Sequence, residues 1–75
     1  MEKLDPILSA FGGNVRRWRE KRSLTQEALA EKANLDPTYI SGIERGLRNP
    51  GIKNVVRLAG ALGITTAALV TGVQA

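Results

Sequence analysis

Hydrogen-bonding side chains recur every three or four residues between positions 38 and 45. One face of a helix through this stretch would carry only small or hydrogen-bonding groups: Thr38, Ser41, Gly42 and Arg45. Ile40 and Ile43 would share the opposite, inward face, and Tyr39 would lie between the two. A helix with small polar groups on its outer face is suited to entering the major groove of DNA and contacting base edges.

A second helical pattern directly precedes this one, and the turn between the two is short. Thr25 is a good N-cap for the earlier helix, and strong helix formers follow it. Asn34 stands where the chain needs a left-handed residue, and Asp36 with Pro37 can cap and restart a helix at once. Residues 25–46 therefore predict a helix-turn-helix, with the second helix as the recognition helix.

An apolar stripe predicts another helix before this motif, from about residue 5 to residue 22. Its apolar side chains are spaced three and four residues apart: Leu8, Phe11, Val15 and Trp18. We interpret Trp18 as a core residue, with stacking on nucleic acid as the alternative. Gly12 and Gly13 cost about 2 kcal/mol relative to alanines, so we expect the helix to start late or to bend there. Residues 1–4 are expected to be frayed.

Two more helical patterns follow a loop over residues 47–51. The first spans residues 52–62 and carries one apolar stripe: Ile52, Val55, Leu58, Ala59 and Leu62. The second is short, from Ala67 to about Val70. No alternating strand pattern occurs along the chain. The sequence therefore predicts an all-α fold of five helices in one compact domain over residues 1–75.

The composition excludes several classes of protein. The chain has 75 residues with no cysteine and no histidine, which leaves no disulfide framework and makes zinc ligation untenable. No apolar run approaches about 18 residues, the length of a membrane span, and the N-terminus has no signal-peptide pattern. We therefore expect a cytoplasmic protein with no metal, no cofactor and no membrane partner.

No catalytic constellation is present in the sequence. Ser9, Ser23 and Ser41 have no local base, and Gly12-Gly13 lacks the strand that a nucleotide-binding glycine loop would follow. A nucleophilic lysine would need a desolvated pocket that so small a domain can hardly build. We expect that the protein is not an enzyme.

Basic residues outnumber acidic ones, with a formal net charge of +4. Five of them crowd one short stretch: Arg16, Arg17, Arg19, Lys21 and Arg22. On its own this stretch is typical of a solvated helix face. Beside a helix-turn-helix it also suits a surface that attracts phosphate groups.

The residues of the motif carry a family resemblance. It rests on these positions: Gln26, Ala30, Asn34, Ile40, Ser41, Ile43 and Glu44. They resemble the motif of the phage-repressor and Cro-like family, often called the XRE family, although Asn34 replaces the usual turn glycine. The similarity extends over residues 11–72. Within the family, residues 36–46 look most like controller proteins of restriction–modification systems.

The resemblance implies roles for residues outside the recognition helix. In the family an arginine matching Arg19 pairs with the glutamate matching Glu44 and fastens the first helix to the recognition helix. The loop after that helix lies along the DNA backbone in the family. The candidate phosphate contacts are therefore Gln26, Arg48, Asn49 and Lys53, with a simple solvated loop as the alternative.

The C-terminal helix, about residues 66–72, carries apolar side chains with little polar cover. Leu69 and Val70 are the candidate dimer contacts, and Val70 or Val73 could remain outside the core. The family resemblance also implies a homodimer. Ordinary packing at the end of the chain is the alternative.

Two hypotheses for function follow. The first is a sequence-specific regulator that binds double-stranded DNA as a homodimer, with RNA polymerase as a further candidate partner. Two recognition helices about 34 Å apart would contact a near-palindromic operator, through four candidate base-contacting residues: Thr38, Tyr39, Ser41 and Arg45. The second is a protein-interaction module, such as an antitoxin-like or adaptor domain. Small polar groups on the recognition helix favour DNA, since protein hot spots favour aromatic and large apolar groups.

Overall fold

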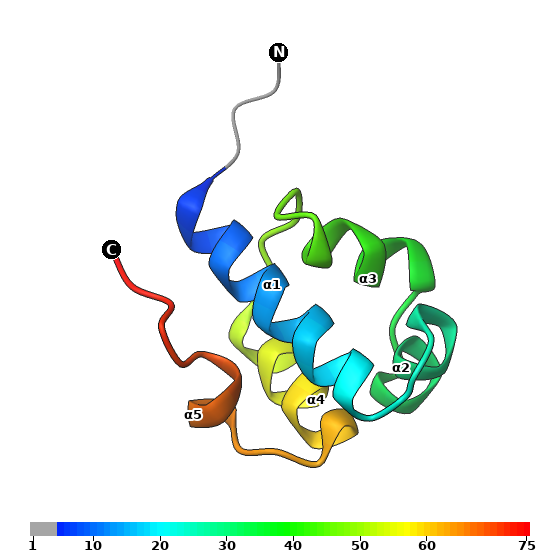
Figure 1. Cartoon of the computed structure of the whole chain (residues 1–75). Coiled ribbons are helices and arrows are strands. Elements are labelled where there is room, and N and C mark those ends of the chain that lie inside the picture. The colour runs from blue at the N-terminus through cyan, green and yellow to red at the C-terminus, as the bar shows by residue number, and fades with distance from the viewer. Residues whose placement is uncertain (1–4) are drawn as a thin grey trace.

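The computed structural model describes residues 5–75, so the expectation for residues 1–4 lies outside it. Figure 1 shows an arrangement of five helices, and no strand occurs in the described part of the chain. The helices are α1 (Pro6–Lys21), α2 (Gln26–Ala33), α3 (Pro37–Glu44), α4 (Ile52–Leu62) and α5 (Thr66–Leu69). The all-α, five-helix prediction is confirmed.

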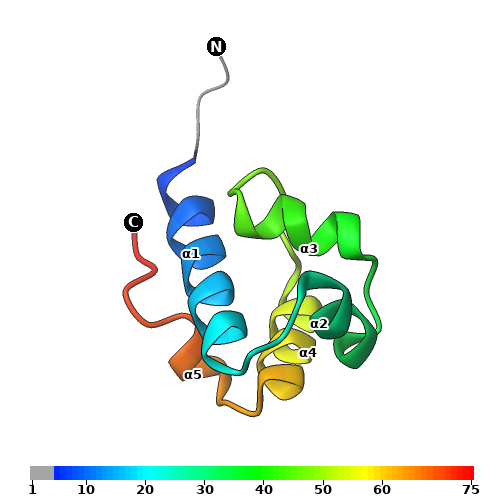
Figure 2. The ribbon, with the colours of Figure 1, turned by 45° about the vertical axis from the view of Figure 1, so that its right-hand side comes forward.

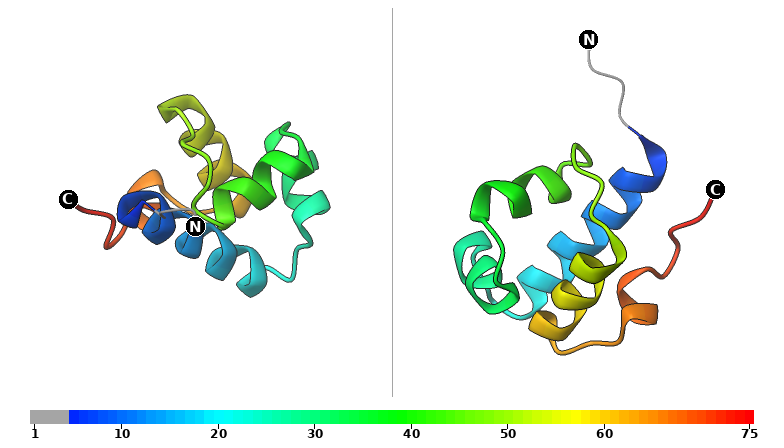
Figure 3. Two further views of the ribbon diagram at one scale, coloured as in Figure 1. Left: turned by 90° about the horizontal axis from the view of Figure 1, so that it is seen from above. Right: turned by 180° about the vertical axis from the view of Figure 1, so that it is seen from behind.

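The first helix supports the rest of the domain. α1 packs against α3, α4 and α5, while α2 packs against α3 and α4. Figure 2 shows α2 and α3 joined by a short turn on the side of the molecule away from α5. Seen from behind in Figure 3, α4 lies alongside α1, and the chain after α5 returns past the N-terminal half of α1. This arrangement leaves the outer side of α3 without a neighbouring helix.

One hydrophobic core joins all five helices. The largest side chains with less than 2% exposure come from every helix: Val15, Leu29, Ile40, Ile43, Leu58, Leu62 and Leu69. Trp18 is half-buried and packs against this cluster, which favours the core interpretation over nucleic-acid stacking. Lys21 Nζ and the Arg22 guanidinium carbon lie 5.1 and 5.3 Å from the centre of its ring. The ring is therefore flanked by cations as well as packed.

The turn between α2 and α3 has the conformation that its residues predict. Asn34 is left-handed, with φ 57° and ψ 48°, and ends α2. Asp36 accepts a hydrogen bond from the Thr38 amide at 2.7 Å, and Pro37 is the first residue of α3. Thr25 Oγ1 accepts from the Ala28 amide at 3.0 Å at the start of α2. Residues close in sequence therefore set the start and the end of α2 and the start of α3.

Two expectations for the helices are wrong. α1 is one helix from Pro6 to Lys21, so it does not start late, and Gly12 lies where the backbone of α3 comes closest. A Cβ built on Gly12 would lie 2.2 Å from the Ile43 carbonyl oxygen, so packing there outweighs the local cost of glycine. Ile52 belongs to the apolar stripe predicted for residues 52–62, but its side chain is 71% exposed and does not share the burial of the stripe. It occupies the first turn of α4, at the edge of the apolar stripe.

A buried asparagine fastens the C-terminal segment to α1. Asn14 is 5% exposed, and its Nδ2 donates to the carbonyls of Leu69 and Thr71, both at 2.8 Å. The Arg17 guanidinium donates to Asn14 Oδ1. Asn14 stands three residues after Phe11 on the buried side of α1, so it is a polar residue at a core position, which the apolar stripe alone did not reveal.

No helix within residues 5–75 combines the length and the apolar character needed to cross a membrane.

Candidate nucleic-acid interface

The outer face of α3 presents hydrogen-bonding groups to solvent. Thr38 and Arg45 are exposed and Ser41 is half-buried, while Ile40 and Ile43 on the opposite face are fully buried. The helix therefore has the polarity that its sequence predicts. None of these three polar side chains takes part in a side-chain hydrogen bond or ion pair within the described chain. Their donors and acceptors are free to meet a partner.

Tyr39 lies at the border between the two faces of α3. It is half-buried and packs against the core, and its hydroxyl accepts a hydrogen bond from Asn54 Nδ2 at 3.4 Å. The ring is therefore held between α3 and α4 and does not project freely from the recognition helix. Asn54 was not singled out in the sequence, and it orients the end of this candidate base contact.

Gly42 does not lie open on the outer face as the helical pattern suggested. Gly42 is buried, and the side chain of Arg48 covers it. Arg48 is itself exposed. The loop after α3 therefore folds back onto the recognition helix and adds an arginine to its outer surface.

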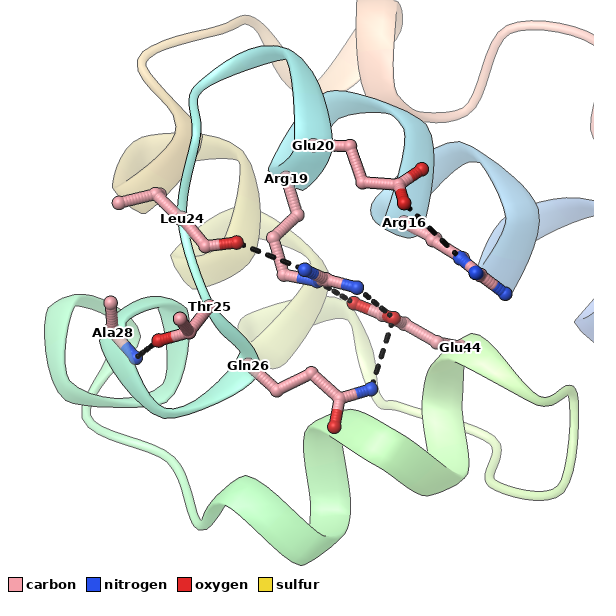
Figure 4. A network of polar contacts seen from close by, with 8 residues as sticks. All are labelled: Arg16, Arg19, Glu20, Leu24, Thr25, Gln26, Ala28 and Glu44. Atoms are coloured by element: carbon pink, nitrogen blue, oxygen red, sulfur yellow. Dashed lines mark hydrogen bonds and ion pairs between the residues drawn. The ribbon is translucent and has the colours of Figure 1, made fainter.

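A bidentate ion pair fixes the inner end of α3 to α1 (Figure 4). Arg19 Nε lies 2.6 Å from Glu44 Oε2, and Arg19 Nη2 lies 3.0 Å from Glu44 Oε1. A third donor of the same guanidinium reaches the Leu24 carbonyl at 2.9 Å. The side chains are 13% and 3% exposed, so the predicted pair is present and shielded from water.

The same pair sets the charge state of the seam between the two helices. The hydrogen bond to Glu44 raises the pKa of the Arg19 guanidinium above its ordinary value; burial opposes this, and the charge of Glu44 adds to it. The raised pKa keeps the Arg19 guanidinium charged well into the alkaline range. The stability that this guanidinium contributes would be lost as the pH rises through its raised, strongly alkaline pKa.

Gln26 is tied to this pair as well. Its Nε2 donates to Glu44 Oε1 at 3.1 Å, so the amide group bridges α2 to the carboxylate that closes α3 (Figure 4). One N–H of the Gln26 side-chain amide is thus engaged within the protein. Its carbonyl oxygen accepts no bond from the described chain, but an oxygen cannot donate to a phosphate. For Gln26 to reach phosphate, the remaining N–H would have to do so.

The other candidate phosphate contacts are accessible. Arg48, Asn49 and Lys53 are all exposed, and they follow one another from the loop into the first turn of α4. Arg57 is exposed one turn further along α4 and lines a shallow hollow together with Lys53. Arg57 was not among the expected phosphate contacts, although its spacing of four from Lys53 places both on one helix face.

The basic stretch on α1 does not form a single solvent-facing charge cluster. Arg19 points inward to Glu44, while Arg22 Nε donates to the Leu62 carbonyl at 2.9 Å at the end of α4. Arg16 forms an exposed pair with Glu20 at 3.6 Å. Arg19 and Arg22, which the sequence offered as basic groups for phosphate, instead connect helices of the domain.

The candidate dimer contacts differ from each other in exposure. Leu69 is fully buried in the core of its own chain, so its assignment to a dimer surface is wrong. It closes the core beneath α5, because Asn14 holds its carbonyl against α1. Val70, the next residue, is 36% exposed. Ile52 and Val56 on α4 are 71% and 51% exposed. They form a second apolar surface, which the apolar stripe of the sequence did not indicate.

No group of three or more acidic, histidine or cysteine side chains that could hold a metal ion occurs among residues 5–75.

The short turn between α2 and α3, the exposed polar face of α3 and the helices beneath it define a helix-turn-helix domain. The helix-turn-helix family matches the chain over residues 15–69. The protein belongs to this family, in its phage-repressor and Cro-like (XRE) branch.

Relatives of two kinds are similar to the chain. Control protein C.MunI of a Mycoplasma species is 36% identical over 72 residues, covering 95% of this chain and 97% of the relative. The immunity repressor protein of Bacillus phage phi105 is 46% identical over 59 residues, covering 79% of this chain. The match spans 41% of the length of that repressor, so its whole activity does not transfer to this chain.

Solved controller proteins have the same fold. The structure of the restriction–modification controller C.AhdI from Aeromonas hydrophila superposes with a TM-score of 0.81 and 42% identity, over 83% of this chain and 94% of that one. The controller C.Esp1396I, determined as a tetramer in complex with its natural 35 base-pair operator, gives a TM-score of 0.81 and 38% identity over 87% and 86% of the two chains.

Proposed function

We propose that the protein is a cytoplasmic transcriptional regulator, and not an enzyme, that binds a near-palindromic double-stranded DNA operator as a homodimer. The observation that carries this proposal is the contrast between the two faces of α3. Its inner face is fixed by the core and by the Arg19–Glu44 pair, while its outer face presents Thr38, Ser41 and Arg45 with unsatisfied donors and acceptors. A rigid helix with a free polar face is suited to the major groove.

Each residue of the outer face has a distinct role in this proposal. The hydroxyls of Thr38 and Ser41 contact base edges, and the methyl group of Thr38 can pack against a thymine methyl. Arg45, at the C-terminal end of α3, contacts a guanine or the neighbouring phosphate. Tyr39 contributes its ring edge, because its hydroxyl is already engaged with Asn54. Pro37 removes one polar side chain from the start of the helix, which places more weight on DNA shape.

Phosphate contacts position the recognition helix in the groove. Arg48, Asn49 and Lys53 form one exposed run beside the end of α3, as a backbone contact requires. The remaining N–H of Gln26 and the N-terminus of α2 would approach the other strand. A dimer that neutralises about eight phosphates has a slope of about −7 in a plot of log affinity against log salt concentration.

A homodimer supplies the spacing that two half-sites need. The exposed Val70 at the end of α5 is the proposed contact between protomers, because Asn14 fixes this segment on α1 and leaves that side chain outside. The relative C.Esp1396I is a tetramer in the complex with its natural 35 base-pair operator, which supports an oligomeric form on DNA here. We extend the controller role, including autoregulation at its own promoter and contact with RNA polymerase, to this protein on the same similarity.

The test is selection from random DNA duplexes at about 0.15 M salt, the ionic strength at which phosphate contacts alone are largely screened. Duplexes retained by the wild-type protein are sequenced and compared with those retained by Thr38→Ala with Ser41→Ala. We expect a two-fold symmetric motif for the wild type and its loss in the double variant.

Two other outcomes would overturn parts of the proposal. Retention without an enriched motif would reduce the protein to a basic domain that coats DNA. No retention would favour the protein-interaction module, and the exposed Ile52 and Val56 would then be the surface to probe.

A further inference from the structure

Gly42 lies on the outer face of α3 but is covered by the side chain of another residue, Arg48. It lies four residues after Thr38 and three before Arg45, so the turn of the helix places it on the same side as both. It is nevertheless buried. A Cβ built on Gly42 would lie 2.6 Å from Arg48 Cγ, 3.5 Å from its Nε and 3.6 Å from its Cδ. The side chain of Arg48 therefore occupies the space that any side chain at position 42 would need.

The loop after α3 brings Arg48 back to the helix. The Leu47 amide donates to the Gly42 carbonyl at 2.9 Å, and Gly46 is left-handed with φ 74°. This sharp return places the stem of Arg48 across α3, one turn from the exposed end of the helix. The stem of Arg48 from Cγ to Nε lies over Gly42, so the Arg48 side chain lies against the outer surface of α3.

The glycine is unfavourable for the helix itself. Gly42 has an ordinary helical conformation, unlike the left-handed Gly46, so the backbone does not require glycine at this position. Alanine would be a better helix former there. The three atoms nearest to the missing Cβ all belong to Arg48, so glycine leaves room for that side chain to approach the helix closely.

We propose that Gly42 is a positioning residue for DNA recognition: it provides the gap in which Arg48 lies, so that the recognition helix presents the Arg48 guanidinium in a fixed orientation. A fixed guanidinium binds a pair of acceptor atoms, which DNA offers on the edge of guanine and on phosphate. This inference rests on the proposed function, because it names a device within the same interface. It assigns a role in DNA binding to a residue that has no side chain to contact DNA.

Four variants test the device: Gly42→Ala, Arg48→Ala, the double variant, and Gly13→Ala as a matched control. Gly13 is also a mid-helix glycine, but nothing lies within 4 Å of the Cβ it would gain. The dissociation constant is measured for the operator found by selection with the wild type, and the melting temperature is measured for each variant. Nε–H relaxation of Arg48 is recorded by NMR without DNA.

Gly42→Ala is expected to weaken operator binding by about tenfold or more, the size of one bidentate contact. Its melting temperature should equal or exceed that of the wild type, and the Arg48 Nε–H should become more mobile. In the Arg48→Ala background the same substitution should change binding by less than about twofold, because the group that Gly42 positions is gone. Gly13→Ala should leave binding and Arg48 mobility unchanged.

The proposal is overturned if Gly42→Ala binds as tightly as the wild type, or if it weakens binding equally with and without Arg48. A change in the salt slope of Arg48→Ala by about 0.9 for each contact would assign the acceptor pair to phosphate. An unchanged slope with altered preference at one base pair would assign it to guanine, and either assignment supports the device. Failure of the wild type to select any operator would refute the proposed function instead, and the NMR measurement would still report on the Gly42–Arg48 contact.

Discussion

The inner and outer sides of α3 differ in whether their polar side chains have partners within the protein. On the inner side the buried carboxylate is paired: Glu44 accepts from Arg19 and from Gln26. On the outer side Thr38 and Arg45 are exposed and have no side-chain partner within the described residues. Contacts on the inner side contribute to folding, and groups on the outer side keep their hydrogen-bonding capacity for another molecule. The two sides should therefore respond differently to substitution.

This difference separates stability from binding along one short helix. A substitution on the inner side removes or strands a buried group, and its cost appears in the free energy of unfolding. A substitution on the outer side leaves the core intact and should change unfolding by less than about 0.5 kcal/mol. Its effect should appear in the affinity for DNA.

The largest effect is expected from Arg19→Met. The substitution keeps an unbranched side chain but leaves the Glu44 carboxylate, 3% exposed, with Gln26 as its remaining side-chain donor. The free energy of unfolding should fall by about 3 kcal/mol, the usual cost of stranding one partner of a buried pair. Urea denaturation followed by circular dichroism measures this change.

Arg16→Met is the matched control for Arg19→Met. Arg16 pairs with Glu20 at 3.6 Å, near the buried pair (Figure 4). The Arg16 and Glu20 side chains are 65% and 57% exposed. Screening by water limits this pair to about 0.5 kcal/mol. Equal losses in the two variants would contradict the contrast between the pairs. Removing both partners of the buried pair, with Arg19→Met and Glu44→Met, should restore part of the lost stability.

The two adjacent glycines of α1 should give effects of opposite sign. A Cβ at Gly12 would lie 2.2 Å from the Ile43 carbonyl oxygen and 2.8 Å from that of Glu44, and both are backbone atoms of α3 that cannot turn aside. Gly12→Ala should therefore destabilise by about 2 kcal/mol through overpacking. Gly13→Ala meets nothing within 4 Å and should stabilise by up to about 1 kcal/mol. Thermal unfolding of both variants tests the pair, and the same sign for both would contradict the close approach of α1 and α3.

These glycines also mark the boundary of what the sequence could predict. The turn between α2 and α3 was predictable because Asn34, Asp36 and Pro37 act on their own neighbours, through local capping and left-handed backbone. The reason for a glycine at position 12 was not predictable, because it depends on where α3 crosses α1. A local penalty can be estimated from the sequence, but the contact that outweighs it cannot.

In the candidate site, too, some features follow from the local sequence and others depend on distant contacts. The polarity of α3 follows from helical spacing, so the exposure of Thr38 and the burial of Ile40 were correctly expected. The covering of Gly42 by Arg48 depends on the path of a loop, and the exposure of Ile52 depends on which neighbours the first turn of α4 meets. The burial of Leu69 depends on Asn14, which lies 55 residues away in sequence. None of these follows from periodicity alone.

The dimer surface provides a test outside α3, with a smaller expected effect. Val70→Asp places a charge on a side chain that is 36% exposed, so the monomer should fold normally. If Val70 lies between protomers, the dimer dissociation constant should rise by about tenfold, because the charge would have to be desolvated on association. Sedimentation equilibrium measures it. Ile52→Asp makes the same change on the other apolar surface, and dissociation in that variant alone would move the interface to α4.

The smallest effect is expected from the loss of one phosphate contact on the outer side. Lys53 is exposed in the first turn of α4, next to the loop that carries Arg48. Lys53→Gln removes the charge and keeps a side chain of similar length. Operator affinity should fall a few-fold at about 0.15 M salt, while the unfolding free energy stays within about 0.5 kcal/mol of the wild type.

The salt dependence distinguishes this role from a general effect of charge. Each lost phosphate contact flattens the log–log slope by about 0.9, so a dimer that lacks two should have a slope shallower by about 1.8. Lys32→Gln is the control, because Lys32 is an exposed lysine that lines a hollow near the C-terminal end of α4, with Leu62 and Gly63. It should leave the slope unchanged. Equal flattening in both variants would mean that DNA responds to net charge and not to the surface beside α3, and the contrast between the two sides of that helix would then describe folding alone.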